Sequence, residues 1–130
     1  MAKPAVAVLA TDKEQCREIS ELLRASDYPT VALHSFADLH EHIRGASVKV
    51  LLVDLDNAVV DNSFFRNIKK RQPEVFILAL SSASHHPDLK ESMGSHIYAC
   101  LAKPLDPEEL LYWLWSISEH EGAPQPSGRM

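Results

Sequence analysis

The sequence predicts a doubly wound α/β domain of (βα)5 order, in which helices cover both faces of a five-stranded parallel sheet. Five short apolar runs alternate along the chain with segments of helical periodicity. The runs are almost continuously hydrophobic, which is typical of parallel strands that are buried on both faces. Strands and helices that alternate within one small domain form βαβ units, and such units build a three-layer sandwich.

The run from Val48 to Val53 is predicted as a central strand. It follows the Gly45-Ala46-Ser47 break, is rich in β-branched residues and ends at Asp54. In open parallel sheets, ligands bind beyond the carboxyl ends of the strands. Asp54 is therefore the first candidate functional residue.

The first half of the chain begins with a predicted strand over residues 5–10. An amphipathic helix is expected over 14–25, where apolar residues recur at helical spacing, and a short strand over 30–34. Ser35 is the expected N-cap of a second helix, which ends at Gly45 because glycine favours the backbone conformation that terminates helices.

The second half is predicted to contain a third helix before Pro73, a loop with a short helix over 83–94, and a last helix that ends near residue 120. Asp106 and Pro107 mark the start of the last helix as its N-cap and its first-turn proline. The remaining strands are predicted over residues 74–80 and 97–102.

Length and composition indicate one domain over residues 1–120. The chain has 130 residues, of which 45% are hydrophobic, so it can bury one core but is too short for two ordinary domains. Residues 121–130 contain Gly and Pro without apolar periodicity and are expected to form a flexible tail or an interdomain linker.

Charge and hydropathy exclude several classes of function. The net charge is -5 and the longest basic run is Lys69-Lys70-Arg71, so the chain lacks the basic stripe that direct nucleic-acid binding needs. No stretch approaches the roughly 20 apolar residues of a membrane span. We therefore expect a cytoplasmic protein without membrane contact, in which Cys16 and Cys100 stay reduced.

Polar side chains follow four of the predicted strands, and parallel topology brings these strand ends to one edge of the sheet. The four residues are Asp12, Asp54, Ser81 and Lys103. Two carboxylates make an oxygen-rich site suited to Mg²⁺, and a hydroxyl with an ammonium suits the oxygens of a phosphoryl group. The cluster therefore indicates phosphoryl transfer onto Asp54.

Several segments also resemble the receiver domain of bacterial two-component response regulators, over about residues 4 to 119. The resemblance is carried by Asp54-Leu55 followed by Asp61, by Ser81-Ser82, and by Leu101-Ala102-Lys103-Pro104-Leu105-Asp106-Pro107-Glu108-Glu109-Leu110. It implies a flavodoxin-like fold. It further implies a signalling switch, and not an enzyme, that a sensor histidine kinase or a phosphotransfer protein phosphorylates with the help of Mg²⁺.

The resemblance implies a role for individual residues. Asp54 would be the phosphoacceptor, Ser81 the hydroxyl that follows the phosphoryl group, and Lys103 its cationic contact. Asp12 and Asp54 would bind Mg²⁺ together with the backbone carbonyl of Asp56.

The sequence departs from the family at several places, among them Ala58 in place of a common proline and Asn62 in place of a common glycine, and two departures concern the mechanism. One carboxylate of the acidic pair after the first strand is missing, whether the pair is Thr11-Asp12 or Asp12-Lys13, and Cys100 stands where an aromatic residue typically switches rotamer. These departures leave open a divergent pseudo-receiver, a protein-interaction or dimerisation module that works without phosphorylation. A third hypothesis, nucleotide or flavin binding, lacks a glycine-rich phosphate loop.

The last helix combines a core stripe with aromatic residues. Aromatic residues are enriched in protein interfaces, so we expect a partner surface here, including a homodimer through the last strand and helix. The expected core residues are Leu110, Leu111, Leu114 and Ile117, and the expected surface residues are Tyr112, Trp113 and Trp115.

Overall fold

The computed structural model describes residues 3–10, 12–35, 39, 48–56, 60–83 and 86–119 of the chain. Its five strands form a parallel sheet in the order β2-β1-β3-β4-β5. The strands are β1 (Ala5–Leu9), β2 (Thr30–Leu33), β3 (Val48–Asp54), β4 (Phe76–Ser81) and β5 (Ile97–Ala102). The run that carries Asp54 is therefore the central strand, as predicted.

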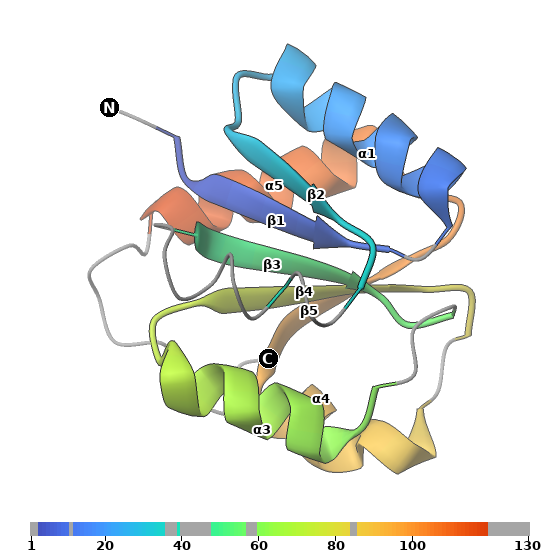
Figure 1. Ribbon diagram of the computed structural model, residues 1–130, viewed down its shortest axis with the longest axis vertical. Coiled ribbons are helices and arrows are strands. Elements are labelled where there is room, and N and C mark those ends of the chain that lie inside the picture. The colour runs from blue at the N-terminus through green and yellow to red at the C-terminus, as the bar shows by residue number, and fades with distance from the viewer. Residues whose placement is uncertain are drawn as a thin grey trace.

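Helices cover both faces of this sheet (Figure 1). On one face lie α1 (Lys13–Ala25) and α5 (Pro107–Glu119), and on the other lie α3 (Asn62–Arg71) and α4 (Lys90–Ser95). A short 3-10 turn, η1 (Pro87–Leu89), leads into α4. The predicted three-layer, doubly wound, flavodoxin-like fold is confirmed. Most of the helix expected after Ser35 and the tail over residues 121–130 lie outside the described residues.

The central strand β3 is apolar over residues 50–53 because helices cover both of its faces there. Val50 and Leu52 pack into the core layer beneath α1 and α5, whereas Leu51 and Val53 pack into the layer beneath α3. All four side chains are almost completely buried. Because both faces are covered, the strand is apolar from Val50 to Val53, and its charged residues, Lys49 and Asp54, lie toward its two ends.

Local hydrogen bonds determine where α1 and β4 begin, more than the helix or strand propensity of the residues does. Helix α1 starts at Lys13 because the side chain of Asp12 caps it. Strand β4 starts at Phe76, since the amide of Val75 still closes a turn on the carbonyl of Gln72 at 3.1 Å. No helix within the described ranges is long and apolar enough to cross a membrane.

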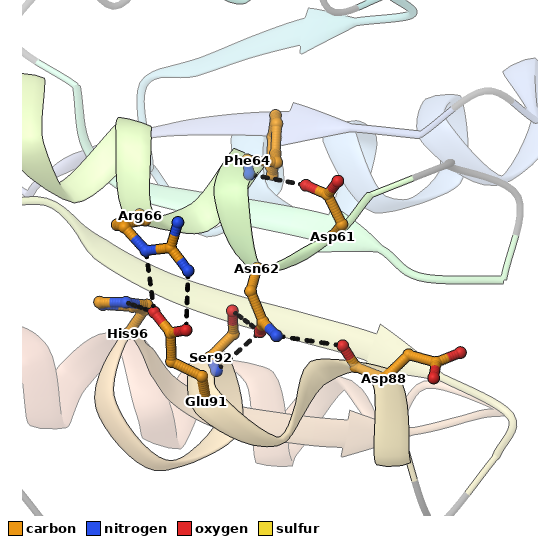
Figure 2. Close-up of polar contacts among 8 residues, drawn as sticks. All are labelled: Asp61, Asn62, Phe64, Arg66, Asp88, Glu91, Ser92 and His96. Carbon is orange, nitrogen blue, oxygen red and sulfur yellow. Dashed lines mark hydrogen bonds and ion pairs between the residues drawn. The ribbon is translucent and has the colours of Figure 1, made fainter.

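A group of polar side chains joins α3 to α4 (Figure 2). The amide nitrogen of Asn62 donates to the carbonyl of Asp88 at 3.2 Å, and its amide oxygen accepts from the backbone N–H of Ser92 at 3.0 Å and from its hydroxyl at 2.6 Å. Ser92 is fully buried, so this contact satisfies two donors that water cannot reach. Asn62 therefore fixes the position of α4.

An exposed ion pair adds a second connection between the two helices. The guanidinium of Arg66 binds the carboxylate of Glu91 through two hydrogen bonds of 3.0 and 2.8 Å, and Nε2 of His96 lies 3.2 Å from the same carboxylate (Figure 2). Arg66, followed by His96, lowers the pKa of Glu91 from 4.5 to about 2. The folded state therefore favours ionised Glu91.

We expect Arg66→Ala to raise the pKa of Glu91 toward its ordinary value, because the largest cause of the shift is removed. In the native chain, the contribution of this pair to stability is complete above pH 4.5 and is lost as the pH falls through about 2. The measurement is an NMR pH titration of the Glu91 side-chain carbon. Lys70→Ala, an exposed change on the same helix, is the control; an unchanged midpoint in Arg66→Ala would contradict the assignment.

Candidate functional site

Backbone pairing places three of the predicted site residues side by side at the carboxyl edge of the sheet. Asp54 at the end of β3 pairs with Leu80 of β4, and Ser81 pairs with Ala102 of β5. The backbone N–H of Lys103 donates to the carbonyl of Ser81 at 3.1 Å, which continues the ladder one residue beyond β5. The sheet itself therefore positions Asp54, Ser81 and Lys103 next to one another.

The carboxylate of Asp54 is the most deeply buried charged group of the site. Asp54 is only 2% exposed, and its Oδ1 accepts from Nζ of Lys103 at 3.0 Å and from the backbone N–H of Asp56 at 2.9 Å. A carboxylate in such a place is stable only when donors and a positive charge surround it. Lys103 supplies the charge.

Asp56 contributes a second carboxylate to the site, although the resemblance implied a role only for its backbone carbonyl. Its Oδ2 lies 2.8 Å from Nζ of Lys103 and accepts from the backbone N–H of Ser82 at 3.0 Å, and its Oδ1 accepts from the hydroxyl of Ser81 at 3.3 Å. One ammonium thus bridges two carboxylates.

These contacts change the pKa values of both partners. The hydrogen bond from Lys103 is the largest cause that lowers the pKa of Asp56. Burial by itself would lower the pKa of Lys103, but hydrogen bonds with Asp56 and Asp54 outweigh it, so the pKa of Lys103 is raised. Both groups are therefore charged at neutral pH.

Gln15 from the first turns of α1 completes the surroundings of Asp54. In the amide orientation that satisfies both neighbours, its nitrogen donates to Oδ2 of Asp54 and its oxygen accepts from Nζ of Lys103 at 3.2 Å. No sequence pattern singles out Gln15, because an amide at a partly exposed helical position belongs to no recognised motif. The structure places it against the predicted phosphoacceptor.

Asp12, the predicted metal ligand from the end of the first strand, is engaged elsewhere. Its Oδ1 accepts from the backbone N–H groups of Glu14 and Gln15 at 3.0 and 3.2 Å, which is the geometry of a helix N-cap. A role of Asp12 in binding Mg²⁺ remains a prediction. An aspartate at this position can either cap the helix or bind a metal ion, so the residue type alone does not distinguish the two roles.

The donors around Asp54 also decide how well the site suits Mg²⁺. The ion needs carboxylate or carbonyl oxygens that are free to bind it, whereas both oxygens of Asp54 accept hydrogen bonds, from Lys103, Asp56 and Gln15. Within the described part of the chain, no group of three or more His, Cys, Asp or Glu residues is placed to bind a metal ion. The residues in this arrangement do not fit Mg²⁺.

The predicted partner surface on α5 divides into an exposed and a packed part. Tyr112 and Trp115 are 55% and 57% exposed. Trp113 is partly buried and meets the ring of Tyr98 on β5 edge-on, with 5.7 Å between ring centroids. Tyr112 and Trp115 therefore form the accessible part, and we refer to these two residues as the α5 aromatic pair.

Comparison with known proteins identifies a family that covers most of the chain. The family model described as response regulator receiver domain matches residues 6–114. No curated protein matches the chain.

Solved structures share the whole fold at low sequence identity. The signal receiver domain of an HD domain-containing protein from Pseudomonas fluorescens Pf-5 has a TM-score of 0.83 at 17% identity, with 94% of this chain and 99% of that chain covered. A CheY-like receiver domain protein from Methanospirillum hungatei JF-1 has a TM-score of 0.82 at 14% identity, with the same coverage. The chemotaxis response regulator CheY4 of Vibrio cholerae has a TM-score of 0.75 at 18% identity, covering 88% of this chain and 98% of that chain.

We expect Gln15→Glu to make the stability of the protein depend on Mg²⁺. The new carboxylate would face that of Asp54, so the free energy of unfolding should fall by about 1–3 kcal/mol as Asp54 loses a donor and gains a like charge. Millimolar Mg²⁺ should restore part of this loss, because the new carboxylate would be a further oxygen ligand for the ion beside Asp54. Thermal unfolding with and without Mg²⁺ measures the effect. Gln15→Met, of similar length and without charge, is the control, and an equal response of the two variants would contradict the expectation.

Proposed function

The chain belongs to the family of response regulator receiver domains, and from this premise we propose that Asp54 accepts a phosphoryl group from a sensor histidine kinase or a phosphotransfer protein. The observation that carries the proposal is the buried Asp54 carboxylate, which lies 3.0 Å from Nζ of Lys103 at the carboxyl edge of the sheet. The protein acts as a signalling switch and not as a metabolic enzyme.

The transfer uses the Asp54 carboxylate as the nucleophile. A carboxylate oxygen attacks the phosphorus of a phosphohistidine, a P–O bond forms, and the P–N bond breaks. The electron pair of the broken bond returns to the imidazole nitrogen, which takes up one proton from water, and Asp54 becomes an acyl phosphate.

The residues around Asp54 stabilise this change through charge and hydrogen bonds. The ammonium of Lys103 offsets negative charge on the phosphoryl oxygens, and the Ser81 hydroxyl and the Ser82 N–H are donors within the same site. Mg²⁺ is typical of this acidic pocket in the family and would supply further positive charge when bound. Because the present donors do not fit the ion, no step is assigned to it here.

The α5 aromatic pair is the surface that we assign to a partner, either the phosphodonor protein or a second copy of the chain bound through β5 and α5. A chain of ring contacts connects it to the sheet, from Phe76 on β4 through Tyr98 to Trp113, with centroid separations of 5.2 and 5.7 Å. The hydroxyl of Tyr98 also lies 3.3 Å from that of Ser116 on α5. These contacts join α5 to the beginning of β4 and β5, at the opposite end of the strands from Ser81 and Lys103.

Intact mass spectrometry after incubation with acetyl phosphate and Mg²⁺ tests the assignment of Asp54. The native chain should gain about 80 Da, the mass of one phosphoryl group on the carboxylate. Asp54→Ala should gain nothing, because it lacks the nucleophile, and Asp27→Asn on a distant turn should behave as the native chain. An increment in Asp54→Ala, or none in the native chain, would contradict the proposal.

We expect Trp115→Ser to weaken self-association of the phosphorylated chain by about 30-fold, the effect of losing an interface residue that contributes about 2 kcal/mol. Sedimentation velocity as a function of concentration provides the measurement. Thermal stability should change little, because the side chain is 57% exposed. Glu119→Ser, an exposed change on the same helix, is the control; equal association of the two variants would remove Trp115 from the dimer surface.

A further inference from the structure

The side chain of Asp56 occupies a complete anion-binding arrangement. Its carboxylate accepts from the hydroxyl of Ser81 at 3.3 Å and the backbone N–H of Ser82 at 3.0 Å, and it lies 2.8 Å from the ammonium of Lys103. These donors come from the end of β4 and from the residue after β5. A hydroxyl, an amide and an ammonium directed at one acid group form the kind of site that binds phosphate oxygens.

The same donors lie next to the carboxylate that is proposed to be phosphorylated. The ammonium of Lys103 is 3.0 Å from Oδ1 of Asp54 and 2.8 Å from Oδ2 of Asp56, so one group serves both. A phosphoryl group attached to Asp54 would need these donors, and its negative charge would repel a carboxylate already bound to them. The phosphoryl group and the Asp56 carboxylate therefore cannot bind these donors at the same time.

The main chain at Leu55 and Asp56 is held by hydrogen bonds that do not involve the Asp56 side chain. The backbone N–H of Asp56 donates to Oδ1 of Asp54, and the N–H of Leu55 donates to the carbonyl of Leu80, each at 2.9 Å. The Asp56 side chain is 24% exposed, so it has access to water on its outer side. It can therefore rotate away from the site without breaking the backbone hydrogen bonds of Leu55 and Asp56.

We propose that the Asp56 carboxylate is an internal substitute for the phosphoryl group, which occupies the anion site beside Asp54 in the resting state and has to leave before phosphorylation. The inference rests on the proposed function, because phosphorylation of Asp54 is the event that displaces the Asp56 carboxylate. Asp56 then acts as a brake on phosphorylation. Its carboxylate also neutralises Lys103 while no phosphoryl group is present.

The variant that tests the inference is Asp56→Asn, which keeps the size of the side chain and removes its charge. Asp27→Asn is the matched control, because it makes the same chemical change at an exposed turn between α1 and β2, at the other end of the strands. Two quantities are measured on the native chain and on each variant. One is the initial rate of the mass increase with acetyl phosphate and Mg²⁺, and the other is the affinity for inorganic phosphate, followed by NMR at the Ser82 amide.

We expect Asp56→Asn to be phosphorylated about tenfold faster than the native chain and to bind inorganic phosphate about tenfold more tightly, in line with the loss of charge-assisted hydrogen bonds to the competing carboxylate. Asp27→Asn should match the native chain in both. Equal rates and equal phosphate affinities in all three proteins would overturn the inference and leave phosphorylation of Asp54 intact.

The phosphate titration separates this inference from the proposed function. If no protein gains mass but Asp56→Asn still binds phosphate more tightly at Ser82, the internal anion stands and the phosphorylation of Asp54 is wrong. If no protein gains mass and the phosphate affinities are equal, both proposals are wrong.

Discussion

The shared ammonium of Lys103 is the interaction on which the site depends. It lies between the carboxylates of Asp54 and Asp56, at 3.0 and 2.8 Å, and no more than 24% of any of the three side chains is exposed. Two carboxylates this close in a poorly solvated place would repel each other. The ammonium of Lys103 offsets this repulsion. The hydrogen bond from the backbone N–H of Lys103 to the carbonyl of Ser81 holds the main chain of Lys103 at the edge of the sheet. The geometry of the sheet edge and its electrostatics are thus a single constraint.

The fold was predictable because a parallel sheet covered on both faces demands continuous apolar runs. Each strand was located from such a run, and the order of strands and helices then allowed few topologies. The boundaries were less predictable. Glu74 and Val75 have strand character by composition, but the hydrogen bond from Val75 to Gln72 keeps them in the turn after α3. Cys100, expected in a buried strand, is exposed because β5 is an edge strand of the sheet.

The part of the candidate site that strand pairing brings together was predictable from the sequence. Asp54, Ser81 and Lys103 lie at strand ends, and pairing of parallel strands brings them together whatever their side chains do. The contributions of Gln15 and of the Asp56 carboxylate depend on side-chain rotamers and on which turn of α1 lies over the sheet edge. Neither is encoded in periodicity or residue type, so these contacts required the three-dimensional structure.

The connection between α3 and α4 has a consequence for how the molecule opens. Helix α4 has only six residues, too few to persist by its own backbone hydrogen bonds. Its order comes from the buried contact of Asn62 with Ser92 and from the pair of Arg66 with Glu91 (Figure 2). Local unfolding of α4 therefore requires its bonds to α3 to break, so the two helices form one cooperative unit in the native ensemble. A ligand that binds only when α4 is unfolded would therefore also have to break the contacts between α4 and α3. The free energy of breaking these contacts would lower its affinity.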